Sequence, residues 1–238
     1  MAADVRKRNP LKGDTAIWKI RTPRVYRYLP RQFVEAFFAA GALRVSSFRQ
    51  FSEHSDEQRL DSKEGKVFLV HRTAANGGQT VVMEVDYGHD AYVLSGSMTP
   101  SKQLLADFKC DSAIVISDTT SFAREIAKQI PDFKAGLEGP CSYQYRRIIE
   151  KDLGWLDFGT QEETSDLSKM DAEVVTRMYS ELNTADAYFL KREVHRHQGE
   201  YRFIWLTYGP VKPVIDIVVP DARRYCVPWE GQGDVLAY

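Results

Sequence analysis

The sequence predicts an α+β fold, a single domain with a split or strongly curved mixed β-sheet flanked by helices. Segments with the two-residue alternation of strands and segments with the 3.6-residue spacing of helices follow one another irregularly. This order lacks the βαβ repetition of a doubly wound sheet. The chain has 238 residues with 43% hydrophobic and 12% aromatic content, enough for one large core. We expect residues 23–238 to form this domain, behind a flexible basic arm over residues 1–22.

The expected helices are marked by their end residues and their apolar stripes. Pro30 is well placed to open a helix with a stripe of Phe and Val, and Gly41 is typical of its C-cap. Asp118 is a suitable N-cap for a second helix, which Pro131 would end. Two further helices are expected over residues 102–108 and from a capping box at Ser168.

The expected strands are short segments of alternating or continuously apolar residues, bounded by Gly, Pro, Asn or Asp. Taken in chain order, they cover residues 25–29, 43–48, 66–70, 80–86, 91–95, 112–116, 143–149, 200–207, 213–219 and 223–227. Between the second and third of them lies a long polar, acid-rich segment that ends at Lys66, and long loops of this kind are often functional.

The strand over residues 200–207 has two different faces, because side chains alternate along a strand. Tyr201, Phe203 and Trp205 share one face, which we expect to lie in the core. Glu200 and Arg202 share the other face. They could form an ion pair on a solvated face, or Glu200 could be a functional carboxylate presented from a rigid element. The rest of the chain has to decide between these two hypotheses.

Composition limits the classes of protein to which this chain could belong. No apolar run approaches the ~20 residues of a membrane span, and the basic start of the chain lacks the apolar core of a secretory signal. The three cysteines are far apart, which predicts a reducing, cytoplasmic environment without a disulfide framework. Residues 1–50 hold eleven Lys and Arg against three acids, so this region could attract a nucleotide phosphate or a nucleic-acid backbone. A basic surface that merely balances acids elsewhere is the alternative.

The common enzyme signatures for phosphate loops, dinucleotide folds, serine hydrolases and zinc proteases are missing. Asp61, Glu64 and Lys66 imitate the carboxylate and lysine set of metal-dependent nucleases. Their spacing is wrong for that set, since the aspartate is expected on a preceding strand. His195 and His197 do not share a face, so they predict no metal site by themselves.

An arginine between two tyrosines, Tyr26-Arg27-Tyr28, lies on the first expected strand. A guanidinium there could bind a phosphate or diphosphate through two hydrogen bonds, and a tyrosine could stack on a flat ring. The alternative is an arginine packed on aromatic rings at the edge of a strand. The residue types alone do not separate these two roles.

The order of several short motifs resembles a widespread bacterial domain family of unknown function, whose members open with Tyr-Lys/Arg-Tyr. The resemblance covers about residues 25–220. The motifs are Tyr26-Arg27-Tyr28, the segments LRVSSFRQF, YVLSGS, SAIVISDTTSF and SYQYRRI, and finally Lys191 with Gly199-Glu200-Tyr201-Arg202.

The layout of that family is similar to the mono-ADP-ribosyltransferase plan, and this resemblance implies both a function and a site. The implied function is NAD-dependent ADP-ribosyl transfer to nucleic acid or protein, as a bacterial toxin or phage-defence effector, with NAD as a substrate and no metal. Glu200 and Arg27 are the implied catalytic residues. The implied NAD-binding residues are Tyr26, Arg27, Tyr28, Ser46, Ser47, Ser95, Ser97 and Arg202.

Two other classes of function remain open at this point. A non-catalytic nucleotide- or nucleic-acid-binding module would use the same basic N-terminal region. A metal-dependent nuclease would use Asp61, Glu64 and Lys66. Titration with NAD separates the three, because the transferase binds it near Arg27, the module binds oligonucleotide instead, and the nuclease requires a divalent ion for cleavage.

Overall fold

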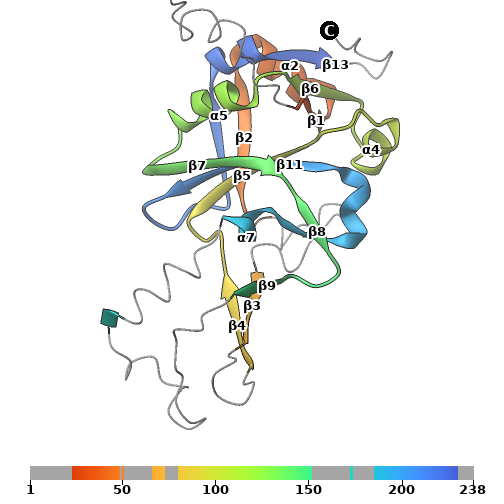
Figure 1. Cartoon of the computed structure of the whole chain (residues 1–238). Helices are drawn as coiled ribbons and strands as arrows, with labels where there is room; N and C mark the ends of the chain where they lie inside the picture. Colours follow the sequence, from red (N-terminus) through yellow and green to blue (C-terminus); the bar gives the residue numbers. More distant parts are fainter. Residues whose placement is uncertain are drawn as a thin grey trace, which may run out of the picture.

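The computed structural model describes residues 23–48, 50, 66–72, 80–151, 172–173 and 185–229. These residues form the predicted α+β fold, in which helices pack on a large sheet and two smaller sheets extend from it (Figure 1). The basic arm over residues 1–22, the expected helix from Ser168 apart from residues 172–173, and Asp61 and Glu64 lie outside the described residues. No helix within the described ranges is long and apolar enough to cross a membrane.

In the described part of the chain, the main sheet has eight strands, and every pairing within it is antiparallel. Its strands are β1 (Val25–Leu29), β2 (Ala42–Ser47), β5 (Ala91–Ser97), β6 (Ser112–Ile116), β7 (Phe133–Pro140), β11 (Glu200–Thr207), β12 (Val214–Val218) and β13 (Cys226–Trp229). β6 is buried along its whole length, which explains why its sequence is continuously apolar.

The sheet divides at β5, which agrees with the split form of the predicted sheet, although parallel pairs are found among the described strands only in the two smaller sheets. One edge of β5 pairs with β11 along its whole length. The other edge is shared, because β2 pairs with it at Tyr92 and Val93 and β1 pairs with it at Ser97. The two strands therefore diverge beside the middle of β5, and this divergence brings side chains of β1 close to the backbone of β5.

Three helix ends lie where the sequence marks them, at Pro30, Gly41 and Asp118, whereas the helix that follows Asp118 ends at Ala127, before Pro131. The C-cap Gly41 has a left-handed φ of 80°, and its N–H donates to the carbonyl of Phe37 at 2.7 Å. The carboxylate of Asp118 accepts from the N–H of Ser121 at 3.0 Å. The helices are α2 (Arg31–Ala40), α4 (Lys102–Asp107), α5 (Thr119–Ala127) and α7 (Asp186–Phe189), with 3-10 helices η2 (Glu193–Gln198) and η3 (Pro220–Tyr225).

The aromatic face of β11 lies in the largest hydrophobic cluster, together with residues of α2 and α5. Tyr201, Phe203 and Trp205 are all buried there, so the predicted orientation of this strand is confirmed. Phe122 of α5 connects the strand to α2, since its ring centroid lies 5.5 Å from that of Phe203 and 6.4 Å from that of Phe37. Packing of both helices on this face therefore fixes β11 in the molecule.

The opposite face of β11 is covered by shorter elements that the sequence predicted only in part. The expected strand over residues 143–149 is two strands, because a turn interrupts it and each half pairs with a different partner. β7 was not predicted at all. The shorter strands are β3 (Lys66–Arg72), β4 (Thr80–Asp86), β8 (Ser142–Gln144), β9 (Ile148–Lys151) and β10 (Leu190–Arg192), with parallel β8–β10 and β3–β9 pairs.

Candidate functional site

Glu200 is the first residue of β11 and is buried on the face opposite the aromatic core. It directly follows Gly199, which ends η2 in the left-handed region with a φ of 49°. This abrupt change from η2 to an extended strand points the carboxylate inward, and only 8% of the side chain is exposed. The solvated face that one of the two hypotheses assumed is therefore not observed, because this face of β11 is covered as well.

Two cationic side chains hold the carboxylate of Glu200. The ammonium of Lys191, on β10, forms an ion pair with Oε2. Nε of Arg202 donates to Oε1 at 2.7 Å, and the Arg202 side chain is only 2% exposed. Nη1 of Arg202 also donates to the carbonyl of Tyr188 at 2.6 Å, and the guanidinium carbon lies 5.6 Å from the centroid of the Phe48 ring. The ion pair between Glu200 and Arg202, one of the two alternatives, is present, but it is buried and not on a solvated face.

The electrostatics of this network favour the ionised form of Glu200. Burial alone raises the pKa of a carboxyl group, because the charged form loses its hydration. The charges of Lys191 and Arg202 and their hydrogen bonds outweigh that effect, so the pKa of Glu200 lies well below its usual range. The carboxylate is therefore negatively charged at neutral pH.

Tyr143 and Gln198 complete the surroundings of Glu200. The backbone N–H of Glu200 donates to the hydroxyl of Tyr143 at 2.6 Å. Lys191 also donates to Oε1 of Gln198 at 2.9 Å. Tyr143 and Lys191 lie opposite each other in the β8–β10 ladder, so one short pair of strands positions both groups beside the start of β11.

Arg27 of β1 contacts the backbone of β5 from the other face of the sheet, since Tyr26 lies opposite Ser97 and Ser97 lies opposite Glu200. Its Nη1 donates to the carbonyl of Ser95 at 2.7 Å, in the part of β5 where β1 and β2 diverge. The hydroxyl of Ser95 in turn donates to Oε1 of Glu200 at 2.9 Å. Arg27 and Glu200 are 173 positions apart in the chain, yet a single residue of β5 contacts both of them.

The two tyrosines beside Arg27 lie elsewhere. Tyr26 and Tyr28 are buried in a separate cluster, where the ring centroid of Trp229 lies 5.6 Å and 5.8 Å from theirs. The hydroxyl of Tyr28 donates to the carbonyl of Thr99 at 3.0 Å, and burial raises the pKa of this tyrosine to about 12. Both rings alternate with Arg27 along β1, so they point away from its side of the strand.

The remaining predicted serines differ in their surroundings. Ser97 lies opposite Glu200 in the ladder, but its buried hydroxyl donates to the carbonyl of Thr99 at 2.9 Å. Ser47 is also buried, and its hydroxyl accepts from the N–H of Gln50 at 3.4 Å. Ser46 lies opposite Val93, which places it on the same face of the sheet as Ser95. Of the four, Ser95 is the one bonded to Glu200.

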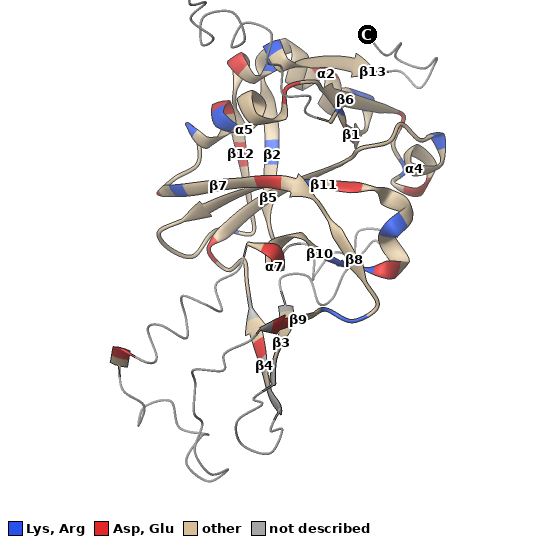
Figure 2. Cartoon of the chain, in the orientation of Figure 1, with Lys and Arg blue, Asp and Glu red and all other residues tan. Residues whose placement is uncertain are grey.

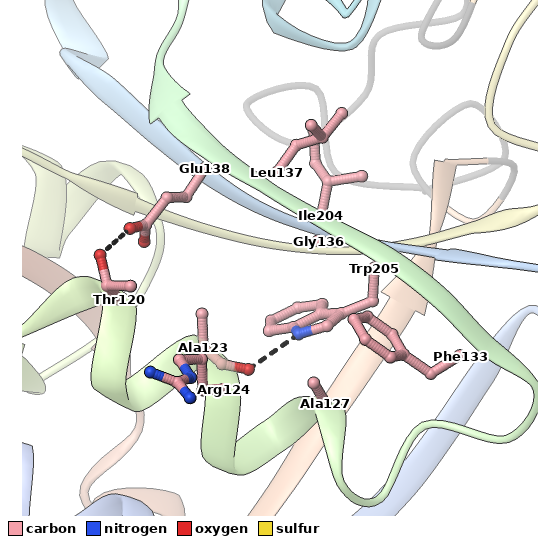
Figure 3. Close-up of a pocket in the computed structure, with 10 residues that line it drawn as sticks. All are labelled: Thr120, Ala123, Arg124, Ala127, Phe133, Gly136, Leu137, Glu138, Ile204 and Trp205. Atoms are coloured by element: carbon pink, nitrogen blue, oxygen red, sulfur yellow. Dashed lines mark hydrogen bonds between the residues drawn. The ribbon is translucent and has the colours of Figure 1, made fainter.

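A cavity of about 260 Å³ lies on the other side of β11, between α5 and β7 (Figure 3). Its wall includes the ring of Trp205, whose Nε1 donates to the carbonyl of Ala123 at 3.0 Å. Glu138 contacts the hydroxyl of Thr120 at one end of this cavity. Because Trp205 and Glu200 point to opposite faces of the strand, this cavity is separate from the Glu200 network.

Sequence reasoning did not assign Lys191, Gln198 or Tyr143 to the site. Lys191 had a usable signal, because it belongs to the same late motif as Glu200 and Arg202. Tyr143 lies in a strand whose sequence predicts only alternation, and its contact depends on the pairing of β8 with β10. For Gln198, the only sequence signal was its position directly before Gly199.

Comparison of the chain with models of protein families, with curated proteins and with solved structures found no match. The chemistry of the site therefore has to be inferred from its own geometry. That geometry combines an ionised buried carboxylate, two cations that hold it, and a third cation joined to it through Ser95.

Proposed function

We propose that this protein is an NAD-dependent ADP-ribosyltransferase in which Arg27 and Glu200 act on one bound NAD. The observation that carries the proposal is the path from Arg27 through Ser95 to Glu200. The transferase plan needs an early-strand arginine, a mid-chain serine and a late-strand glutamate at one place. Residues of these three types, taken from β1, β5 and β11 in that order, are joined here by two hydrogen bonds.

The proposed chemistry uses the charge of Glu200. The bond between the ribose C1′ of NAD and the nicotinamide nitrogen breaks, and nicotinamide leaves with the bonding electron pair. Positive charge then develops on the ribose, and a preorganised carboxylate opposes it. The acceptor attacks C1′ and loses its proton. A lowered pKa supports this role for Glu200, because a protonated carboxyl could not stabilise the cation.

Arg27 has a different role in this proposal. A guanidinium binds diphosphate oxygens through paired, charge-assisted hydrogen bonds. Arg27 contacts the backbone carbonyl of Ser95, whose hydroxyl contacts Glu200, so the proposal requires one NAD molecule to extend across β5 between the two residues. Lys191 and Arg202 then keep the carboxylate ionised and oriented.

The proposed reaction also requires that NAD can reach Glu200. With 8% of its side chain exposed, Glu200 has to become more accessible when NAD binds. The element that covers it and carries Lys191 is β10, followed by η2. We expect amide hydrogen exchange in Leu190–Arg192 and Glu193–Gln198 to change on addition of NAD. Unchanged exchange at saturating NAD would contradict binding at this site.

The deciding experiment measures nicotinamide release by the wild type and by Glu200→Gln. Gln keeps the size of Glu but not its charge, so the rate should fall by about 10²–10³. Because Glu200 is also a buried ion partner, a variant that is destabilised elsewhere is needed as a control. Ile126→Ala removes a fully buried side chain of α5 and should keep its activity below its own melting temperature.

The outcomes separate the three classes of function. If Glu200→Gln still releases nicotinamide, Glu200 is not part of the mechanism. NAD or oligonucleotide binding without release by any variant favours the non-catalytic binding module. Cleavage of nucleic acid that depends on a divalent ion favours the nuclease, whose Asp61 and Glu64 lie outside the described residues.

For the toxin or phage-defence role, we expect expression of the wild type to arrest bacterial growth and expression of Glu200→Gln to permit it.

A further inference from the structure

The turn between β8 and β9 and the neighbouring η2 place cationic and aromatic side chains on one surface. Gln144, the last residue of β8, lies opposite Arg192, the last residue of β10, and Tyr145 and Arg146 follow Gln144 directly. Arg196 of η2 donates to the carbonyl of Tyr143 at 3.4 Å, which ties η2 to β8. Figure 2 shows the basic positions of η2 and of the β8–β9 turn on the same side of the molecule.

We call Tyr145, Arg146, Arg192, Arg196 and His197 the basic surface, and all five side chains are exposed. Tyr145 is 89% exposed, so its ring has almost no packing within the described chain. In the described part of the structure no carboxylate pairs with Arg146 or Arg192, whereas Arg196 pairs with Glu193 at 2.5 Å. Two exposed guanidinium groups and an exposed ring are thus available to a partner.

This combination fits an unpaired nucleic-acid strand. Guanidinium groups neutralise backbone phosphates, and an exposed aromatic ring stacks on a base whose face is not already covered by its neighbours. A duplex keeps its bases stacked and offers no such face to Tyr145. An acidic protein would use the arginines but would leave the exposed ring without a flat partner.

The basic surface is also next to the candidate site. The guanidinium of Arg196 lies 5.3 Å from the centroid of the Tyr143 ring. The hydroxyl of the same tyrosine accepts the N–H of Glu200 at 2.6 Å. One side chain therefore separates the basic surface from the backbone of Glu200, the residue that we assign to ADP-ribosyl transfer.

We propose that the basic surface binds single-stranded nucleic acid and presents it as the acceptor to the Glu200 site. The proposal names the acceptor class and rests on the transferase function proposed above. Arg146 and Arg192 contact phosphates of the strand, and Tyr145 stacks on one of its bases. Transfer then joins C1′ of the ADP-ribose to a nucleophilic atom of the strand, which loses a proton as nicotinamide leaves.

The test measures binding of fluorescein-labelled oligo(dT) and oligo(rU) by anisotropy, without NAD, over a series of salt concentrations. The double variant Arg146→Ala/Arg192→Ala should bind at least about tenfold more weakly, and its salt slope should fall by about 1.4, because each single-strand phosphate contact contributes about 0.7. Tyr145→Ala should weaken binding about tenfold with an unchanged slope, and Tyr145→Phe should restore it. Lys134→Ala/Lys212→Ala removes the same charge from exposed positions elsewhere and should change affinity less than about twofold.

Several results would overturn the proposal. They are an absence of oligonucleotide binding at low salt, an equal loss in the lysine control, or wild-type affinity in Tyr145→Ala. Either of the last two results would mean that the basic surface attracts anions in general and does not recognise a nucleic-acid strand. Binding is measured without NAD, so its failure leaves the transferase function untouched.

In a second step the bound oligonucleotide is incubated with NAD and should gain one ADP-ribose. Nicotinamide release without a modified oligonucleotide overturns the acceptor assignment alone, whereas binding with neither release nor modification overturns the transferase function as well.

Discussion

At the scale of single residues, Glu200 is the counterion of two buried cations. Removing one partner of a buried ion pair leaves an uncompensated charge in a poorly solvated place, which typically costs about 3–5 kcal/mol. Lys191 and Arg202 are both nearly inaccessible, so neither can recover its hydration by a small movement. The same carboxylate that could serve catalysis therefore also holds β10 against β11.

We expect Glu200→Gln to lower the free energy of unfolding by about 3–5 kcal/mol at neutral pH. Since the folded-state pKa of Glu200 is lowered, its contribution is present above the unfolded pKa of about 4.3 and is lost as the pH falls towards the folded value. Wild-type stability should therefore decrease below about pH 4.3, with a flatter dependence in Glu200→Gln. Urea unfolding at several pH values measures both effects.

Glu193→Gln provides the matched control for that experiment. Glu193 pairs with the exposed Arg196 on the outside of η2, so the same substitution should change stability little at any pH. Parallel pH profiles for the wild type and Glu200→Gln would mean that Glu200 is not the group whose protonation weakens the fold.

At the scale of elements, β11 is buried on both faces because α2 and α5 cover one side, and α7 and short strands cover the other. Its aromatic face alternates with its charged face, so one eight-residue strand belongs to the main core and to the candidate site at once. Phe122 and the backbone of Ala123 anchor α5 to Phe203 and Trp205. A substitution that disrupts this packing should therefore lower the stability of the whole domain.

Trp205→Ala should lower the free energy of unfolding by about 3–5 kcal/mol, because it removes a fully buried ring and enlarges an existing cavity. Denaturant unfolding measures the change. Phe133→Ala is a useful comparison, since Phe133 lines the same cavity but is 38% exposed and should cost clearly less. A loss under about 1 kcal/mol for Trp205→Ala would mean that its packing adds little to stability.

Local patterns located most elements but not all of them. α2 and α5 were predictable because cap residues and apolar stripes act within one turn of helix. β7 was not, because its alternating apolar residues are interrupted by two glycines and followed by a proline, which are weak strand formers. Pairing with β11 keeps it extended. The turn within residues 143–149 was missed for the same reason, since β8 and β9 are defined by partners far away in the chain.

At the scale of the whole molecule, the division of the main sheet at β5 decides which residues meet. β1 and β2 diverge there, and Arg27 occupies this region with a hydrogen bond to Ser95. The opposite edge of β5 carries β11 and therefore Glu200. A ligand that contacts both charged groups has to extend across β5.

Arg27→Met should raise the dissociation constant for NAD by about 10- to 100-fold, because a charged hydrogen-bond donor to the diphosphate is lost while the side-chain volume is nearly kept. Titration calorimetry measures the effect. Arg44→Met removes an exposed arginine that pairs with Asp216 at the β2–β12 edge, and it should leave NAD affinity within about twofold. Equal losses in both variants would place the diphosphate away from β1.

Local sequence patterns predicted the fold class, both ends of α2, the start of α5 and the two faces of β11. These follow from local rules, because capping and side-chain alternation depend on neighbouring residues only. Tertiary packing, in contrast, pairs Lys191 with Glu200, connects Arg27 to Glu200 through Ser95, and places Tyr26 and Tyr28 in a different cluster. Strand order and register set those contacts, and both depend on long-range packing that no short segment encodes.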